Sequence, residues 1–226
     1  MAANPLTDTL DAIHTLAEHV LAAARYRIDG HIGLEVVPNG IATPDLGDGV
    51  VVALIGTELV VRRGDGAERA PVTTLRAAGA LVGIEPGAPA DVYPPATSGD
   101  LDAPLALDEP SARALFDWYA LGDAALRRFR ETIGRDDPSG ITLWPEHLDV
   151  AMRAADVNYG ASPGDDLIAE PYVYVGPSPD QRRAGAPAAA EFWSQPFGAA
   201  RTWGEVDGID EVLAFFETGR SFALGL

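Results

Sequence analysis

Apolar side chains recur at helical spacing in four stretches of the chain. Between Thr7 and Tyr26, positions 10, 13, 16, 20 and 24 are three or four residues apart, which places them on one face of a helix. The same spacing runs from Glu109 to Ile133, and shorter amphipathic stretches cover residues 73–82 and 209–216. The sequence therefore predicts two long helices and two short ones.

Runs of alternating or continuous apolar residues predict strands between these helices. Residues 32–37 alternate with a period of two, residues 50–55 are apolar throughout, and residues 59–62 follow after a short turn. Further strands are predicted over residues 141–152, with a bend at Pro145, and over residues 171–175. Residues 156–166 are rich in Asp, Asn, Gly, Ser and Pro and are predicted to form a loop.

Six prolines between residues 83 and 110 mark a connector between two parts of the chain. We predict an N-terminal α+β half over residues 1–84, a Pro-rich linker over 85–108 and a C-terminal α+β half over 109–226. The fold class is therefore α+β, with two related halves that are each a small antiparallel sheet covered by helices.

The order of elements suggests an internal duplication. Strand 32–37 matches strand 148–152, strand 50–55 matches strand 172–175, and helix 74–82 matches helix 209–216. A histidine, His31 or His147, opens the first strand of each half. The alternative is that an α+β chain of this length repeats helix, strand and strand by chance.

The composition excludes several classes of function. The formal net charge is −18 and every basic residue is Arg, so we expect binding neither to nucleic acid nor to an anionic membrane. The absence of Cys excludes disulfides, thiol nucleophiles and Cys-ligated metals. No signal peptide or apolar span is evident, and we predict a cytoplasmic protein without a cofactor.

The segment from Leu143 to Val150 holds the strongest candidate for catalysis. On one strand, His147 and Asp149 would share a face, and the carboxylate would orient the imidazole as a general base, with Glu146 nearby. The same pair would equally suit a solvated strand face. The candidate catalytic residues are His147, Asp149 and Glu146.

Other polar residues give weaker indications. The oxygen-rich residues 156–166 lack the spacing of a calcium-binding loop, so we predict no metal site. His14 and His19 are five residues apart, a poor spacing for two ligands of one metal. His14 and Glu18 are one helical turn apart, as in many surface pairs.

Aromatic residues gather in the second half of the chain, where they would suit either a pocket or a core. The candidate ligand-binding residues are Trp144, Asn158, Tyr159 and Tyr172.

Three motifs carry a resemblance to a known group of sequences. They are WPEHLDVA at 144–151, VNYGASPGD at 157–165 and EPYVYVGP at 170–177. The chain resembles an uncharacterised family of hypothetical proteins from high-GC bacteria, to which no activity is attached. The resemblance therefore implies no reaction, cofactor or catalytic residue.

Three functions remain open at this point. The first is a soluble small-molecule-binding or accessory protein without catalysis of its own, because no established catalytic motif is present. The second is a hydrolase or isomerase in which His147 is the general base and Asp149 orients it. The third is a structural or regulatory homodimer that uses its aromatic second half as the interface.

Overall fold

The computed structural model describes residues 4–183 and 191–226, and the chain divides into two compact units. The first unit comprises Met1–Asp117 and Leu143–Leu148, and the second comprises Trp118–Thr142 and Asp149–Leu226. The fold is α+β with two five-stranded antiparallel sheets, which confirms the predicted fold class. No helix within residues 4–183 and 191–226 has both the length and the apolar character to cross a membrane.

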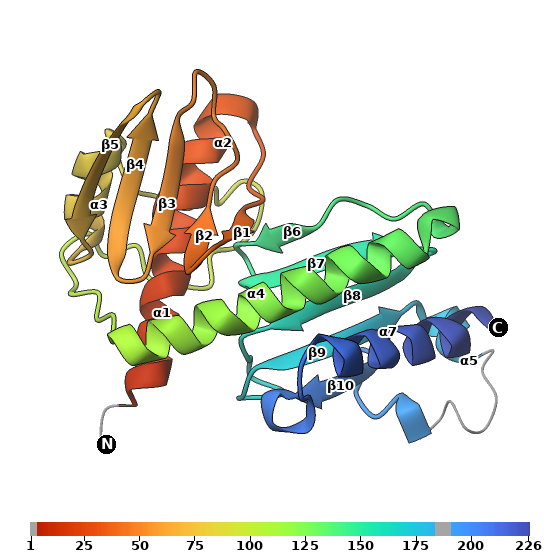
Figure 1. Cartoon of the computed structure of the whole chain (residues 1–226). Helices are drawn as coiled ribbons and strands as arrows, with labels where there is room; N and C mark the ends of the chain where they lie inside the picture. Colours follow the sequence, from red (N-terminus) through yellow and green to blue (C-terminus); the bar gives the residue numbers. More distant parts are fainter. Residues whose placement is uncertain (1–3, 184–190) are drawn as a thin grey trace. The chain divides into compact units, whose positions relative to one another are not determined.

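In the first sheet, each strand pairs with the next strand along the chain (Figure 1). Its strands are β1 (Glu35–Val37), β2 (Gly40–Ala42), β3 (Val51–Ile55), β4 (Glu58–Arg63) and β5 (Gly66–Pro71). Alternate residues of β3 and β4 are fully buried, among them Leu54 and Leu59. Helices cover this buried face of the sheet. They are α1 (Pro5–Leu16), η1 (Ala17–Ala22), α2 (Ala23–Asp29) and α3 (Leu75–Val82).

The helices α1, η1 and α2 follow one another without a break. The first begins two residues earlier than predicted, because the side chain of Asn4 caps the backbone N–H of Leu6 and Pro5 occupies the first turn. The middle segment, η1, is a π-helix of six residues, all of them buried. The periodicity predicted the helix but not this π-helical segment, which buries Glu18 and His19 as well as apolar residues.

The second sheet has the same simple order, with each strand beside its neighbour in sequence. Its strands are β6 (Thr142–Trp144), β7 (Asp149–Ala154), β8 (Val157–Ser162), β9 (Tyr172–Pro177) and β10 (Ala199–Thr202). The longer helices of the second unit are α4 (Glu109–Thr132), from Trp118 onward, and α7 (Ile209–Leu224). Shorter helical segments are η2 (Gly134–Asp136), α5 (Pro179–Arg183) and η3 (Trp203–Glu205).

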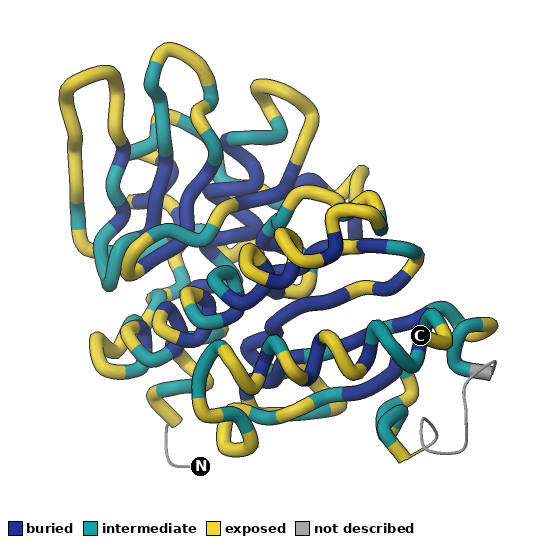
Figure 2. The backbone as a smooth tube through the Cα atoms, turned by 45° about the vertical axis from the view of Figure 1, so that its right-hand side comes forward, coloured by how far each residue is buried: buried dark blue, intermediate teal, exposed yellow. Residues whose placement is uncertain are grey.

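Close packing of α4 and α7 on the second sheet requires glycine in each helix. A Cβ at Gly122 in α4 would lie 2.5 Å from the Cβ of Ala161, and one at Gly219 in α7 would lie 2.8 Å from Val175. The core between them is aromatic: the ring of Tyr159 packs edge-on against Phe129, with centroids 4.8 Å apart. Figure 2 shows the buried backbone concentrated in the strands and along one side of the helices, with exposed turns between them.

Two of the predicted elements are wrong. The single strand predicted over 141–152 is two strands, β6 and β7, joined by a turn at residues 145–148 in which Leu148 has a φ of 51°. The loop predicted over 156–166 contains strand β8, in which Val157 and Tyr159 point into the core and Asn158 points out. The Asn and Gly residues of this stretch indicated a turn. The structure is a strand because Val157 and Tyr159, on either side of the exposed Asn158, are both buried.

The duplication remains a prediction, but its strand correspondences change. In both sheets five strands follow one another, with helices before and after them. However, β1 is the first strand of its sheet and β7 the second, while β3 is third and β9 fourth. The matches suggested by the sequence therefore join strands at different positions.

Candidate functional site

The turn at residues 145–148 belongs to the first unit and is held there by hydrogen bonds to Leu34, just before β1, and to His14 in α1. Leu143, just before it, exchanges two backbone hydrogen bonds with Leu34, at 2.8 and 2.9 Å. The ring nitrogen Nε2 of His14 in α1 lies 2.8 Å from the carbonyl oxygen of Pro145. Because that carbonyl only accepts, Nε2 carries the hydrogen and donates it. These bonds fix the position of Glu146, which follows Pro145.

Burial governs the protonation of His14. Its pKa is lowered from the ordinary value chiefly by loss of solvent, an effect that the nearby negative charges of Glu18 and Asp11 and the bond to Pro145 only partly offset. His14 is therefore a neutral donor that holds the turn.

Glu18 is the most buried acidic residue of the first unit, with 0% of its surface exposed. Its two carboxylate oxygens each accept a backbone N–H at 2.9 Å, from Ala96 and Thr97 respectively, and the Thr97 hydroxyl donates to the same oxygen as the Thr97 N–H. Such charge-assisted bonds offset the cost of burying the carboxylate. The predicted surface pair of His14 and Glu18 is therefore wrong: the carboxylate anchors a loop.

His19, the next residue of the π-helix, holds the same loop. Its Nδ1 accepts the backbone N–H of Ala88 at 3.0 Å, and its carbonyl oxygen accepts the N–H of Gly87 at 3.0 Å. Since Nδ1 accepts, the ring hydrogen is on Nε2, which lies 3.4 Å from the carbonyl oxygen of Thr97. The Pro-rich segment 85–108, expected as a linker, is therefore part of the first unit and is hydrogen-bonded to its π-helix η1.

Two buried oxygen atoms of the first unit lack a hydrogen-bond partner among the described residues. They are the hydroxyl of Tyr93, a residue only 8% exposed, and Oε2 of Glu146. Burial, followed by the negative charges of Glu18 and Glu146, raises the pKa of Tyr93 well above its ordinary value, so its hydroxyl is a neutral donor. We call this group the Glu18 cluster. It comprises Glu18, His19, Tyr93, Thr97 and Glu146.

Of the three predicted catalytic residues, only Glu146 contributes to this cluster. His147 is exposed in the turn. Asp149 begins β7, is 8% exposed and accepts a hydrogen bond from the hydroxyl of Tyr174. The prediction that His147 and Asp149 share one face of a strand is wrong, because His147 lies in the turn and the strand begins only at Asp149. The catalytic roles of these residues stay predictions without that support.

The predicted ligand-binding residues are distributed over several environments. Trp144 is 39% exposed in the first unit, and Asn158 is exposed on β8 in the second. Tyr159 lies in the aromatic core between α4 and α7. Tyr172 donates a hydrogen bond of 2.5 Å to Asp165, whose other oxygen accepts two backbone N–H groups. The two tyrosines therefore contribute to packing and loop structure in the second unit.

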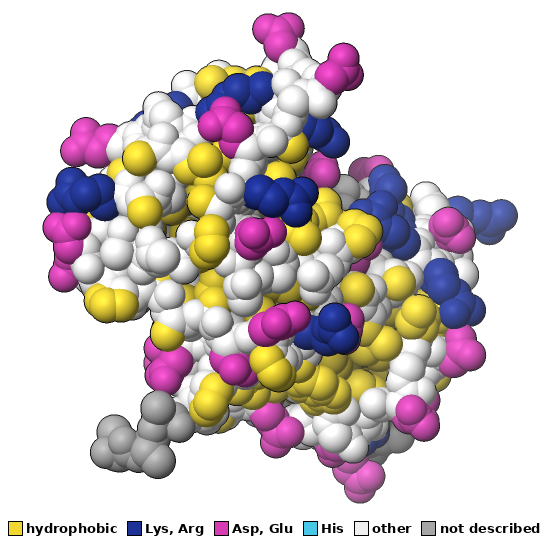
Figure 3. Space-filling view, turned by 60° about the vertical axis from the view of Figure 1, so that its left-hand side comes forward, with side chains coloured by type: hydrophobic (Ala, Val, Ile, Leu, Met, Phe, Trp, Pro, Cys, Tyr) yellow, Lys and Arg dark blue, Asp and Glu magenta, His cyan; other side chains and the backbone are white. Residues whose placement is uncertain are grey.

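Metal binding has no structural support in the described part of the chain. Within residues 4–183 and 191–226, no group of three or more His, Cys, Asp or Glu side chains is arranged to hold a metal ion. Figure 3 shows Asp and Glu side chains spread over the visible face among Arg and hydrophobic side chains rather than gathered at one point.

Sequence reasoning missed most of the Glu18 cluster because its parts are far apart in the chain. Glu18 and its donors are 78 and 79 residues apart, and Tyr93 lies in a segment that suggested only a linker. One signal was present: Glu18 and His19 interrupt an otherwise apolar run from Leu16 to Ala24. Comparisons with protein-family models, curated proteins and solved structures found no significant match.

Proposed function

We propose that this protein binds a small polar molecule at the Glu18 cluster and has no catalysis of its own. The observation that carries the proposal is the pair of buried oxygens, on Tyr93 and Glu146, that have no hydrogen-bond partner among the described residues. A buried polar group without a partner costs roughly 1–3 kcal/mol of stability. A ligand that accepts from Tyr93 and donates to Glu146 would remove both costs.

The rest of the cluster supports binding rather than acid–base chemistry. The carboxylate of Glu18 already accepts three hydrogen bonds, and Nδ1 of His19 accepts one. Neither group is free to take a proton from a substrate. Both instead hold the segment that carries Tyr93 in a fixed position, as a preformed binding site requires.

The first test uses Tyr93→Phe, which removes one unpaired hydroxyl. Acetamide, ethanolamine and glycerol, which each carry a donor and an acceptor, are titrated by calorimetry and by thermal shift. We expect at least one of them to bind the wild-type protein and to bind Tyr93→Phe at least tenfold more weakly. Without ligand, Tyr93→Phe should be as stable as the wild type or more stable, because an unsatisfied buried hydroxyl is lost.

A matched control separates the hydroxyl from a general effect of the ring. Tyr26 packs against the small apolar cluster that includes Tyr93, but its hydroxyl donates to Asp91 at the surface. Tyr26→Phe should leave the affinity unchanged. If no probe binds the wild type, or if Tyr93→Phe binds as tightly as the wild type, the proposal is wrong.

A further inference from the structure

We infer a second ligand site in the first unit, independent of the Glu18 cluster: a cavity suited to a zwitterionic α-amino acid. The cavity has a volume of about 330 Å³ and is lined by residues from the N-terminal end of α4 and from turns at one end of the first sheet. Figure 1 shows where these two elements lie in the first unit. Only Ile55 and Pro71 give it apolar walls. Its polar side chains are those of Asn39, Thr57, Glu58, Glu109 and Arg113.

Backbone interactions hold the walls of the cavity in place. The N–H of Gly56 donates to the carbonyl oxygen of Asn39 at 2.8 Å, and both residues have a φ of 57°, so two left-handed turns pack together. The start of α4 is fixed by Asp108, whose carboxylate accepts the N–H of Ser111 at 3.0 Å. The side chains around the cavity therefore project from a rigid frame.

Four of the five polar side chains have no partner in the part of the chain that the structure describes. Neither a hydrogen bond nor an ion pair involves the side chains of Asn39, Thr57, Glu109 or Arg113. Glu109 and Arg113 are one helical turn apart, a spacing at which such residues often pair. Only Glu58 has a partner, Arg69, at 3.5 Å. The cavity thus presents a guanidinium and a carboxylate that are both available.

The chemistry of these groups selects the class of ligand. The guanidinium of Arg113 matches a carboxylate, which it can bind through two N–H groups. The carboxylate of Glu109 matches an ammonium group. A ligand with one charge would leave the opposite group of the cavity unpaired, and the net charge of −18 disfavours a simple anion. An α-amino acid carries both charges, and the amide of Asn39 and hydroxyl of Thr57 add polar contacts.

The test measures the affinity of L-glutamine by isothermal titration calorimetry, with acetate and ethylammonium as ligands that carry only one of the charges. We expect L-glutamine to bind with a 1:1 stoichiometry, and each single-charge ligand to bind at least tenfold more weakly. Arg113→Gln should weaken L-glutamine at least tenfold. Tyr93→Phe should leave this affinity unchanged, which separates this site from the Glu18 cluster.

Arg62 provides the matched control. It is exposed on β4, makes no ion pair with any described residue and does not line the cavity. Arg62→Gln changes the net charge equally and should bind L-glutamine like the wild type. The inference is wrong if L-glutamine does not bind, if acetate binds as tightly as L-glutamine, or if Arg62→Gln and Arg113→Gln weaken binding equally.

Discussion

Replacing Glu18 by Gln tests whether the buried carboxylate holds the Pro-rich segment. In the wild type, one oxygen accepts the N–H of Ala96 and the other accepts both the N–H and the hydroxyl of Thr97. The amide of Gln has a single oxygen, so its NH₂ group would face one of these donors. One or two of the three hydrogen bonds are lost, and a part-buried backbone N–H is left opposite another donor.

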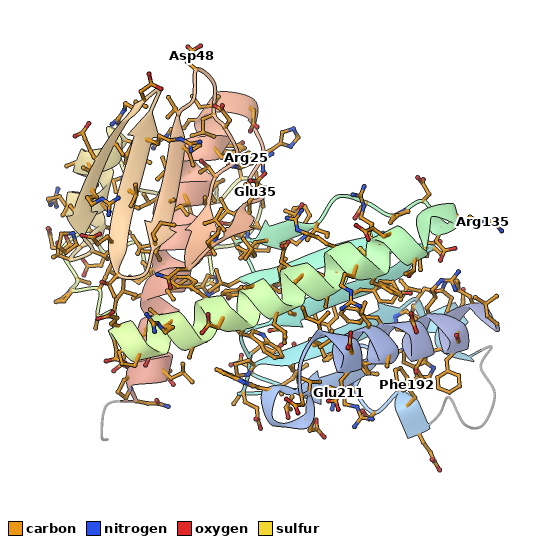
Figure 4. All side chains as sticks on the ribbon, viewed as in Figure 1. Arg25, Glu35, Asp48, Arg135, Phe192 and Glu211 are labelled. Carbon is orange, nitrogen blue, oxygen red and sulfur yellow. The ribbon has the colours of Figure 1, made fainter. Side chains whose placement is uncertain are left out.

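The expected cost follows from these contacts. A hydrogen bond to a charged group contributes roughly 1.5–3 kcal/mol, and an unsatisfied buried donor costs roughly 1–3 kcal/mol. Because the loop can move and admit water, we expect Glu18→Gln to lower the free energy of unfolding by about 3 kcal/mol. The control is Glu35→Gln, since Glu35 is exposed on β1 (labelled in Figure 4) and should change stability by less than about 0.5 kcal/mol.

Urea denaturation followed by circular dichroism measures the free energy of unfolding, and hydrogen exchange of peptides covering residues 86–99 measures local opening. Glu18→Gln should increase exchange at Ala96 and Thr97 more than elsewhere in the first unit. A loss below about 1 kcal/mol, together with unchanged exchange in this segment, would refute the assignment of Glu18 as the anchor of the loop.

Two further predictions concern packing and pH. A Cβ at Gly160 would lie 2.5 Å from Cζ of Tyr174, whereas one at Gly176 would meet its nearest atom at 3.6 Å. Gly160→Ala should therefore lower the free energy of unfolding by about 2 kcal/mol, and Gly176→Ala by less than about 0.5 kcal/mol. Urea denaturation measures both values. Since burial lowers the pKa of His14 in the folded state, its contribution to stability is full above pH 6.5 and declines as the pH falls through its unfolded-state pKa towards its folded-state pKa. His14→Gln should lose less stability than the wild type between pH 7.5 and 5.5, as measured by urea denaturation at each pH. Equal pH dependence in the two proteins would contradict this assignment.

The sequence predicted elements whose side chains repeat regularly. The helix starting at Glu109 was found from its spacing alone, and it ends at Thr132, one residue short of the prediction. The apolar run 50–55 became β3. Strand β5, by contrast, is exposed at almost every position, so no hydrophobic alternation marks it. It is stabilised by pairing with β4, which a local pattern does not reveal.

The candidate site was harder to predict because polar residues acquire their environment from distant segments. Glu18 has the spacing of a surface residue, and only the donors of Ala96 and Thr97 explain its burial. The segment 145–148 gave one usable signal, the proline, which indicated a bend where the structure has a turn. Glu146 was selected for its neighbours in sequence, whereas the structure gives it a position near Tyr93.

The π-helical segment sets the rotational phase between the two ends of the N-terminal helix. Six π-helical residues turn the chain about as far as five α-helical residues, so this segment holds one residue more than an α-helix needs to join the same two ends in the same orientation. Removing one residue between Leu16 and Ala23 would therefore restore ordinary α-helical hydrogen bonding and leave Thr9 and Ile13, both 0% exposed, facing the core. A deletion here should be better tolerated than one elsewhere in the helix, where each lost residue turns the upstream part by about 100°.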